Sequence, residues 1–115
     1  MYSFAISKIP ERIKNLISFS KIRNSKIKYC FLHQANKLIN NTIKFKLNLK
    51  KTKFPTSLEK FGNTSAATIP VSIVNNFKKK QLNGLSICSG FGVGLSVANM
   101  IYNFKNCKVL SFSYL

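Results

Sequence analysis

The chain has 115 residues and a mass of 13.0 kDa, enough for one small domain with its own core and too little for a two-domain enzyme. Hydrophobic residues make up 45% of it and charged residues 18%, which argues against a disordered tail. With 19 Lys and Arg against 2 Asp and Glu, the net charge of +17 predicts an acidic partner: nucleic acid, an anionic membrane or an acidic carrier protein. These basic residues are spread from Lys8 to Lys108, which favours solvated faces of several elements over one basic arm.

The three cysteines, Cys30, Cys88 and Cys107, form an odd set without paired spacing. This pattern argues against a disulfide framework and predicts a reducing, cytoplasmic location. Cys30 and His33 have the spacing of half a zinc site, but no second half follows, so no metal is expected.

The first predicted element is a short amphipathic helix. Ile9, Ile13 and Ile17 recur at helical spacing, and Pro10 and Glu11 suit a first helical turn. After a basic connector, the mostly apolar run at residues 27–32 predicts a strand.

Two further amphipathic helices are predicted after that strand. Residues 34–47 place apolar side chains on one face and a polar stripe that includes Asn40 on the other. Residues 66–77 form the second helix, and the lysines at 78–80 lie at its end, where the helix dipole favours cations.

The last elements are predicted as two strands, residues 85–88 and 95–102, joined by a glycine-rich turn at residues 90–94. Residues 81–104 carry no charge, but Asn and Ser residues interrupt this stretch, so strands fit it better than a membrane span. The order helix, strand, helix, helix, strand, strand predicts a layered α/β domain. Three strands alone leave its sheet incomplete, which suggests a piece of something larger.

Two motifs are specific enough to indicate a family. His33-Gln34-Ala35-Asn36 follows a strand, and the nine-residue motif from Gly62 to Pro70 (GNTSAATIP) precedes a glycine-rich turn between strands. In this order they resemble the C-terminal part of ketoacyl-acyl-carrier-protein synthase III, a condensing enzyme of the thiolase fold. The resemblance covers nearly the whole chain, with a domain expected at residues 1–104 and an unmatched tail at 105–115. The fold it implies is the C-terminal half of a thiolase-like fold, layered α-β-α.

The resemblance also implies a role for each of five residues. His33 and Asn63 occupy the catalytic positions, where both donate hydrogen bonds to the malonyl thioester carbonyl and stabilise the enolate that forms on decarboxylation. The backbone N–H of Val93 matches a second oxyanion hole, Phe91 an active-site aromatic residue, and Asn36 a position near the pantetheine arm. Neither a metal nor a cofactor is needed for this chemistry.

The implied activity is acyl transfer in fatty acid biosynthesis, with acyl-CoA thioesters and an acyl carrier protein as partners. None of the three cysteines matches the family's nucleophile, so the chain is expected to lack it and to need an N-terminal half or a homodimer partner. Two positions depart from the family pattern. Leu38 stands where the family often has an Arg that meets the acidic carrier, and Val97-Ala98 replace a common Trp-Gly pair.

Two other hypotheses remain open from the sequence. The charge is compatible with a small basic nucleic-acid-binding protein, whose binding is expected to be weak and steeply salt-dependent. The chain is also compatible with an inactive remnant of a truncated gene.

Overall fold

A three-stranded sheet forms the centre of the molecule. The structure, a computed structural model, describes residues 2–92 and 96–112. Strand β1 pairs in parallel with β2, and β2 pairs antiparallel with β3, so that the order across the sheet is β1-β2-β3. The strands span Ile27–Leu32, Gln81–Gly92 and Ser96–Lys108.

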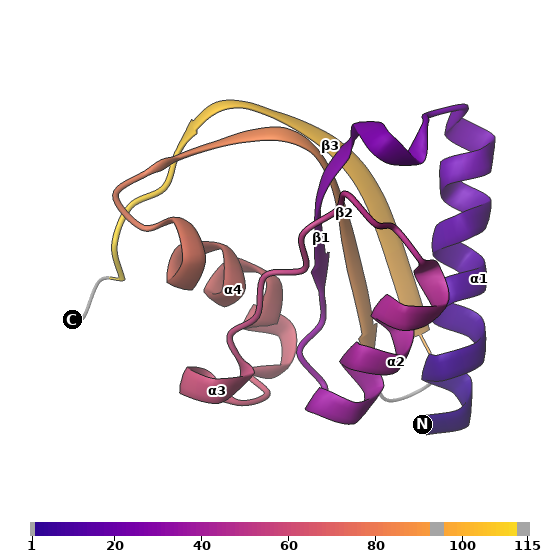
Figure 1. The fold of residues 1–115 in the computed structure, drawn as a ribbon. Helices are drawn as coiled ribbons and strands as arrows, with labels where there is room; N and C mark the ends of the chain where they lie inside the picture. Colours follow the sequence, from indigo (N-terminus) through magenta and orange to yellow (C-terminus); the bar gives the residue numbers. More distant parts are fainter. Residues whose placement is uncertain (1, 93–95, 113–115) are drawn as a thin grey trace.

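Helices cover both faces of this sheet (Figure 1). Helices α1 and α2 lie on one face, and α4 lies on the other, with the single turn α3 beside it. The helices span Tyr2–Ser20, Lys37–Leu47, Leu58–Phe61 and Thr68–Phe77, and 3₁₀ turns occupy Asn24–Lys26 and Ser65–Ala67. The predicted layered α/β arrangement, with cover on both faces of the strands, is therefore confirmed.

Each layer has its own core. On one face, apolar side chains of α1 and α2 pack on the sheet, and this cluster includes Ala5, Ile9, Ile13, Ile39, Ile43, Ile87 and Phe91. On the other face, partly buried residues of α4 pack on Phe31, Leu82 and Cys88. Cys88, on β2, is a small buried residue of this second cluster.

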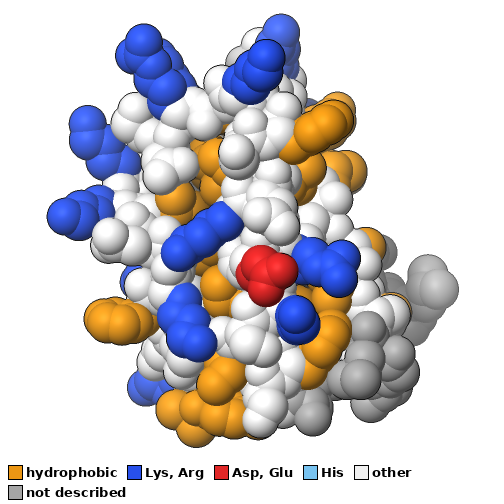
Figure 2. Space-filling view, turned by 90° about the vertical axis from the view of Figure 1, so that its right-hand side faces the viewer, with side chains coloured by type: hydrophobic (Ala, Val, Ile, Leu, Met, Phe, Trp, Pro, Cys, Tyr) orange, Lys and Arg blue, Asp and Glu red, His pale blue; other side chains and the backbone are white. Residues whose placement is uncertain are grey.

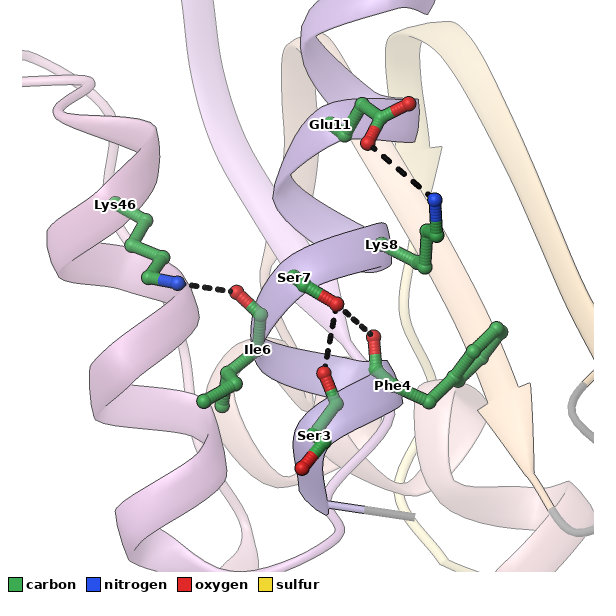
Figure 3. A network of polar contacts seen from close by, with 7 residues as sticks. All are labelled: Ser3, Phe4, Ile6, Ser7, Lys8, Glu11 and Lys46. Carbon is green, nitrogen blue, oxygen red and sulfur yellow. Dashed lines mark hydrogen bonds and ion pairs between the residues drawn. The ribbon is translucent and has the colours of Figure 1, made fainter.

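Helix α1 begins eight residues before Pro10, so the prediction that Pro10 belongs to a first helical turn is wrong. Proline lacks the N–H that would bond the carbonyl of Ile6, four residues earlier. The Lys46 ammonium from α2 takes its place, with its Nζ 2.8 Å from the Ile6 oxygen (Figure 3). A side chain from a neighbouring helix therefore satisfies the carbonyl that the proline leaves open.

The predicted strand at residues 27–32 and the helices near 34–47 and 66–77 are confirmed, with shifted starts. The first of these helices begins at Lys37 because Asn36 caps it, and the second at Thr68 after a 3₁₀ turn. The last two strands are longer than predicted, and helix α3 was not predicted at all. Within residues 2–92 and 96–112, no helix is long and apolar enough to cross a membrane.

Residues beyond 104 continue the fold. Strand β3 extends to Lys108, and Val109 is buried in the cluster below α4. The N–H of Lys79 donates to the Val109 carbonyl at 2.8 Å, and the N–H of Val109 donates to the Lys80 carbonyl at 3.1 Å. The expected boundary at residue 104 accordingly falls inside a strand.

Candidate functional site

A cleft of about 940 Å³ opens where β1 and β2 end and β3 begins. The carboxyl ends of parallel strands meet at one edge of a sheet, where α/β proteins commonly bind ligands. Four of the five sequence-predicted site residues line this cleft. Its lining includes His33, Asn36, Asn63, Phe91, Gly92, Ser96, Val97 and Ala98. Val93 lies outside the described residues.

His33 is the first residue after β1, and backbone contacts hold it at the strand end. Its N–H donates to the carbonyl of Ser89 on β2 at 2.8 Å, and its own carbonyl accepts from the Asn40 side chain at 2.9 Å. The imidazole meets the Phe91 ring edge-on, with centroids 5.1 Å apart. Partial burial lowers the pKa of His33, which favours the neutral imidazole. A neutral ring presents one N–H donor and no charge.

Two buried amides that the sequence reading did not select as site residues fix the loop around His33. Gln34 is 1% exposed; its Nε2 donates to the Leu32 carbonyl at 2.9 Å, and its Oε1 accepts from the N–H of Ser57 at 3.2 Å. Asn40 is 8% exposed, so its assignment to the polar outer stripe of the helix is wrong. Its side chain turns inward because it bonds both His33 and Ala35. In the sequence, the only signal for this network was the amide of Gln34 within the motif HQAN.

Asn63 follows Gly62, which adopts a φ of 64° in the loop after α3. Its Oδ1 accepts a hydrogen bond from the N–H of Ser65 at 2.9 Å. That bond identifies the oxygen side of the amide, so the Nδ2 group is the side left to donate. Within the part of the chain that the structure describes, no acceptor bonds this Nδ2. An exposed amide donor therefore lines the same cleft as the His33 imidazole.

Asn36 has a structural task in addition to lining the cleft. Its side-chain oxygen accepts from the N–H of Ile39 at 2.8 Å and so caps α2. Phe91 is buried below the cleft, against His33. The cleft thus combines two polar donors with a mostly apolar wall, an arrangement suited to a ligand that carries a polarisable carbonyl.

The cysteines are absent from the part of the cleft lining that the structure describes. Cys30 is buried, and burial raises the pKa of its thiol, with nearby Cys88 as a smaller cause. Burial likewise raises the pKa of Cys88. Both thiols are therefore protonated and poor nucleophiles at neutral pH. Among residues 2–92 and 96–112, no three His, Cys, Asp or Glu side chains gather as a metal site.

Comparison with protein families matches residues 17–104 to the C-terminal domain of 3-oxoacyl-[acyl-carrier-protein] synthase III. A beta-ketoacyl-[acyl-carrier-protein] synthase III from Prochlorococcus marinus (strain MIT 9515) is 38% identical over 98 residues, covering 84% of this chain and 29% of the relative. The enzyme of the same name from Streptococcus agalactiae serotype III (strain NEM316) is 37% identical over 105 residues, covering 88% and 32%. The chain therefore spans about a third of the length of these curated relatives.

Solved structures similar to this chain are also ketoacyl synthases. A 3-oxoacyl-(acyl-carrier protein) synthase from Burkholderia xenovorans LB400 superposes with a TM-score of 0.88 at 23% identity, covering 96% of this chain and 32% of that one. The synthase III from Aquifex aeolicus VF5 gives a TM-score of 0.74 at 25% identity, covering 86% and 33%. The fold is therefore the thiolase-like α/β fold expected from the sequence. The nucleic-acid hypothesis gains no support from these comparisons.

Proposed function

The chain belongs to the C-terminal domain family of 3-oxoacyl-[acyl-carrier-protein] synthase III, and from this premise we propose that its cleft stabilises the enolate formed when a malonyl thioester loses carbon dioxide. The observation that carries the proposal is the pairing of two donors in one cleft, the imidazole of His33 and the Nδ2 amide of Asn63. The proposed substrates are a malonyl thioester on an acyl carrier protein and an acyl thioester.

In the proposed step, the bond between the malonyl carboxylate and its neighbouring carbon breaks and carbon dioxide leaves. The electron pair passes through that carbon to the thioester carbonyl oxygen, which becomes an enolate. His33 and Asn63 would donate to this oxygen, where the new negative charge develops. A neutral His33 suits the role, since the lowered pKa keeps the ring uncharged before reaction.

The second half of the reaction needs a nucleophile that carries the acyl group, and the cleft of this chain does not supply it among the residues that the structure describes. The enolate carbon would attack an acyl thioester, form the new carbon–carbon bond and expel a thiolate. The buried thiols of Cys30 and Cys88 are unsuited to carry that acyl group. A Cys-bearing segment, in the same polypeptide or in a partner chain, would therefore complete the site, and the N–H of Val93 would contribute to its oxyanion hole.

Decarboxylation of malonyl-CoA by the 115-residue chain tests the proposal, with acetyl-CoA measured by chromatography. His33→Ala and Asn63→Ala should each lower the rate by about 10²–10³, the usual cost of losing one oxyanion donor. Asn103→Ala is the matched control, because Asn103 is exposed on β3 and does not line the cleft. Equal rates in all three variants would refute the assignment of His33 and Asn63. If the unmodified chain releases no acetyl-CoA above the uncatalysed rate, the isolated cleft does not act as proposed.

A further inference from the structure

Asn40 is a polar side chain on the buried face of α2. Charged side chains lie on the outside of the molecule, and Figure 2 shows many blue Lys and Arg side chains around one small red area on the face formed by α1. Asn40, in contrast, is 8% exposed. Its buried neighbours on the helix are the apolar residues Ile39, Ile43 and Leu47. Because a buried amide must replace the hydrogen bonds it loses to water, and Asn is a weaker helix former than Leu, an apolar side chain would serve the fold at least as well at this position.

The amide of Asn40 connects the two ends of a short backbone segment, residues 33–35. Its Nδ2 donates to the His33 carbonyl at 2.9 Å, and its Oδ1 accepts from the N–H of Ala35 at 3.3 Å. The N–H of Ala35 also donates to the His33 carbonyl at 3.1 Å, so the three groups form a closed ring. A side chain can make both contacts only if it carries a donor and an acceptor side by side, as an amide does.

The orientation of the His33 imidazole depends on this segment. Within the part of the chain that the structure describes, neither ring nitrogen forms a hydrogen bond. The edge-on contact with the Phe91 ring restricts the imidazole but supplies no hydrogen bond. The direction of the ring therefore follows from the backbone of His33, whose N–H is held by the Ser89 carbonyl and whose own carbonyl is held by Asn40.

Asn40 lies behind the cleft and is not part of its wall. The described lining of the cleft includes His33, Ala35 and Asn36 but not Asn40. A ligand in the cleft is therefore not in contact with the Asn40 amide, which can influence that ligand only through the residues it bonds. A substitution at Asn40 should accordingly change the rate of a reaction in the cleft more than the affinity for the substrate.

We propose that Asn40 is a positioning residue, whose amide holds the backbone of residues 33–35 so that the His33 imidazole directs its N–H to the developing enolate oxygen. This inference rests on the proposed function, which makes His33 a donor to that oxygen. Asn40 lies outside both sequence motifs, so it adds a residue that neither motif contains. A misplacement of about 1 Å can lower the rate of an enzymatic step about 10²-fold, so a residue that only holds the backbone can still limit the reaction.

NMR spectroscopy of the 115-residue chain tests the positioning without any assay of activity. The chain has one histidine, so the ring signals of His33 are assigned directly. Asn40→Leu keeps the branched shape of the side chain and removes its donor and acceptor. We expect the ring protons to lose part of the shift that the Phe91 ring imposes, and ring relaxation to show added motion on the picosecond to nanosecond scale.

Asn41→Leu is the matched control for this experiment. It is the same substitution one residue further along α2, where Asn41 is exposed and absent from the described lining of the cleft. The control should leave the His33 ring signals unchanged. The Tm of Asn40→Leu should stay within about 4 °C of that of the unmodified chain, because the His33 carbonyl and the Ala35 N–H still bond each other. Asn40→Ala, which introduces the strongest helix former, repeats the test if the Leu variant does not fold.

Decarboxylation of malonyl-CoA shows whether the positioning acts on the reaction. Asn40→Leu should lower kcat about tenfold or more and change KM by less than about twofold, because the amide does not line the cleft. Asn41→Leu should leave both constants unchanged. In a chain that already carries His33→Ala, Asn40→Leu should have no further effect on kcat, because a residue that acts through the imidazole has nothing left to position.

The positioning role and the proposed function can fail separately. The positioning role is overturned if the His33 ring signals of Asn40→Leu match those of the unmodified chain, or if Asn41→Leu displaces them as much. It is also overturned if Asn40→Leu lowers kcat by the same factor with and without His33→Ala. If His33→Ala decarboxylates malonyl-CoA at the unmodified rate while Asn40→Leu displaces the ring signals, Asn40 positions the ring and only the assignment of His33 to the enolate is rejected.

Discussion

The contact between Lys46 and the Ile6 carbonyl predicts an energetic coupling between α1 and α2. Pro10 cannot donate to that carbonyl, and the Lys46 Nζ does so instead, at 2.8 Å. Lys46→Met keeps most of the aliphatic stem and removes the ammonium. Hydrogen bonds to charged groups contribute about 1.5–3 kcal/mol, but Lys46 is exposed and water can replace it, so we expect a loss of about 1 kcal/mol. For a domain of this size that loss corresponds to a fall in Tm of about 4 °C.

The stability loss expected for Lys46→Met depends on Pro10. Pro10→Ala restores the N–H and with it the helical bond to Ile6. It removes an interior proline that costs about 3 kcal/mol relative to Ala, and it also removes a buried ring, so we expect a net gain of roughly 1 kcal/mol. In that background Lys46→Met should cost less than about 0.3 kcal/mol, because the carbonyl keeps a donor. The coupling energy between the two sites is then at least about 0.7 kcal/mol.

Urea unfolding followed by circular dichroism, applied to the two single variants and the double variant, measures that coupling. Lys50→Met is the control for charge, because it also removes one cation, and Lys50 is exposed and makes no ion pair among the described residues. The reasoning is refuted if Lys46→Met lowers the free energy of unfolding by the same amount with and without Pro10→Ala. It is also refuted if Lys46→Met lowers the free energy of unfolding no more than the control Lys50→Met does.

Three further predictions concern His33 and the cysteines. Because burial lowers the pKa of His33 in the folded chain, the unfolded chain binds more protons below about pH 6.5; stability should therefore fall as the pH drops through this range, and His33→Gln should flatten the fall in urea-unfolding measurements. Under native conditions a thiol-specific disulfide reagent should label half-buried Cys107 first, while buried Cys30 and Cys88 should react only after unfolding; equal native rates would contradict the burial described here. The 115-residue chain supplied with acyl-CoA and malonyl-carrier should form no ketoacyl product by mass spectrometry until a Cys-bearing partner is added, and product that disappears with Cys88→Ser would show that Cys88 is the nucleophile after all.

The fold could be predicted from sequence where hydrophobic spacing and motif agree. The apolar run before His33 gives β1, and the repeat through Ile39 and Ile43 gives α2. The start of α1 could not be predicted, because proline is favoured in a first turn, and only a contact with distant Lys46 makes the interior position acceptable. Helix α3 has four residues, fewer than a periodic pattern requires.

The chemical groups of the candidate site could be predicted from the sequence, but the hydrogen bonds that hold them in place could not. Two motifs gave His33 and Asn63, and the structure places both on one cleft. The buried hydrogen bond of Gln34 depends on the approach of Ser57. That of Asn40 depends on a face of the helix that the sequence predicts to be polar and exposed but that points inward. Such contacts join segments that lie apart in the sequence, so a periodic pattern does not reveal them.

The parallel pairing of β1 with β2 has a consequence for synthesis of the chain. Strand β1 ends at Leu32 and β2 begins at Gln81, with three helices between them. At about 5–20 residues per second, a ribosome needs roughly 2–10 s to make the intervening segment. During that interval β1 lacks its ladder partner β2 and can pair only with Lys53, which bonds Lys28 and Cys30 through the backbone, whereas β2 and β3 can pair as soon as both emerge. Nascent β1 is therefore exposed to misassociation along the edge that β2 later covers, and a chaperone that shields this edge until Gln81–Gly92 emerges should raise the yield of folded chain.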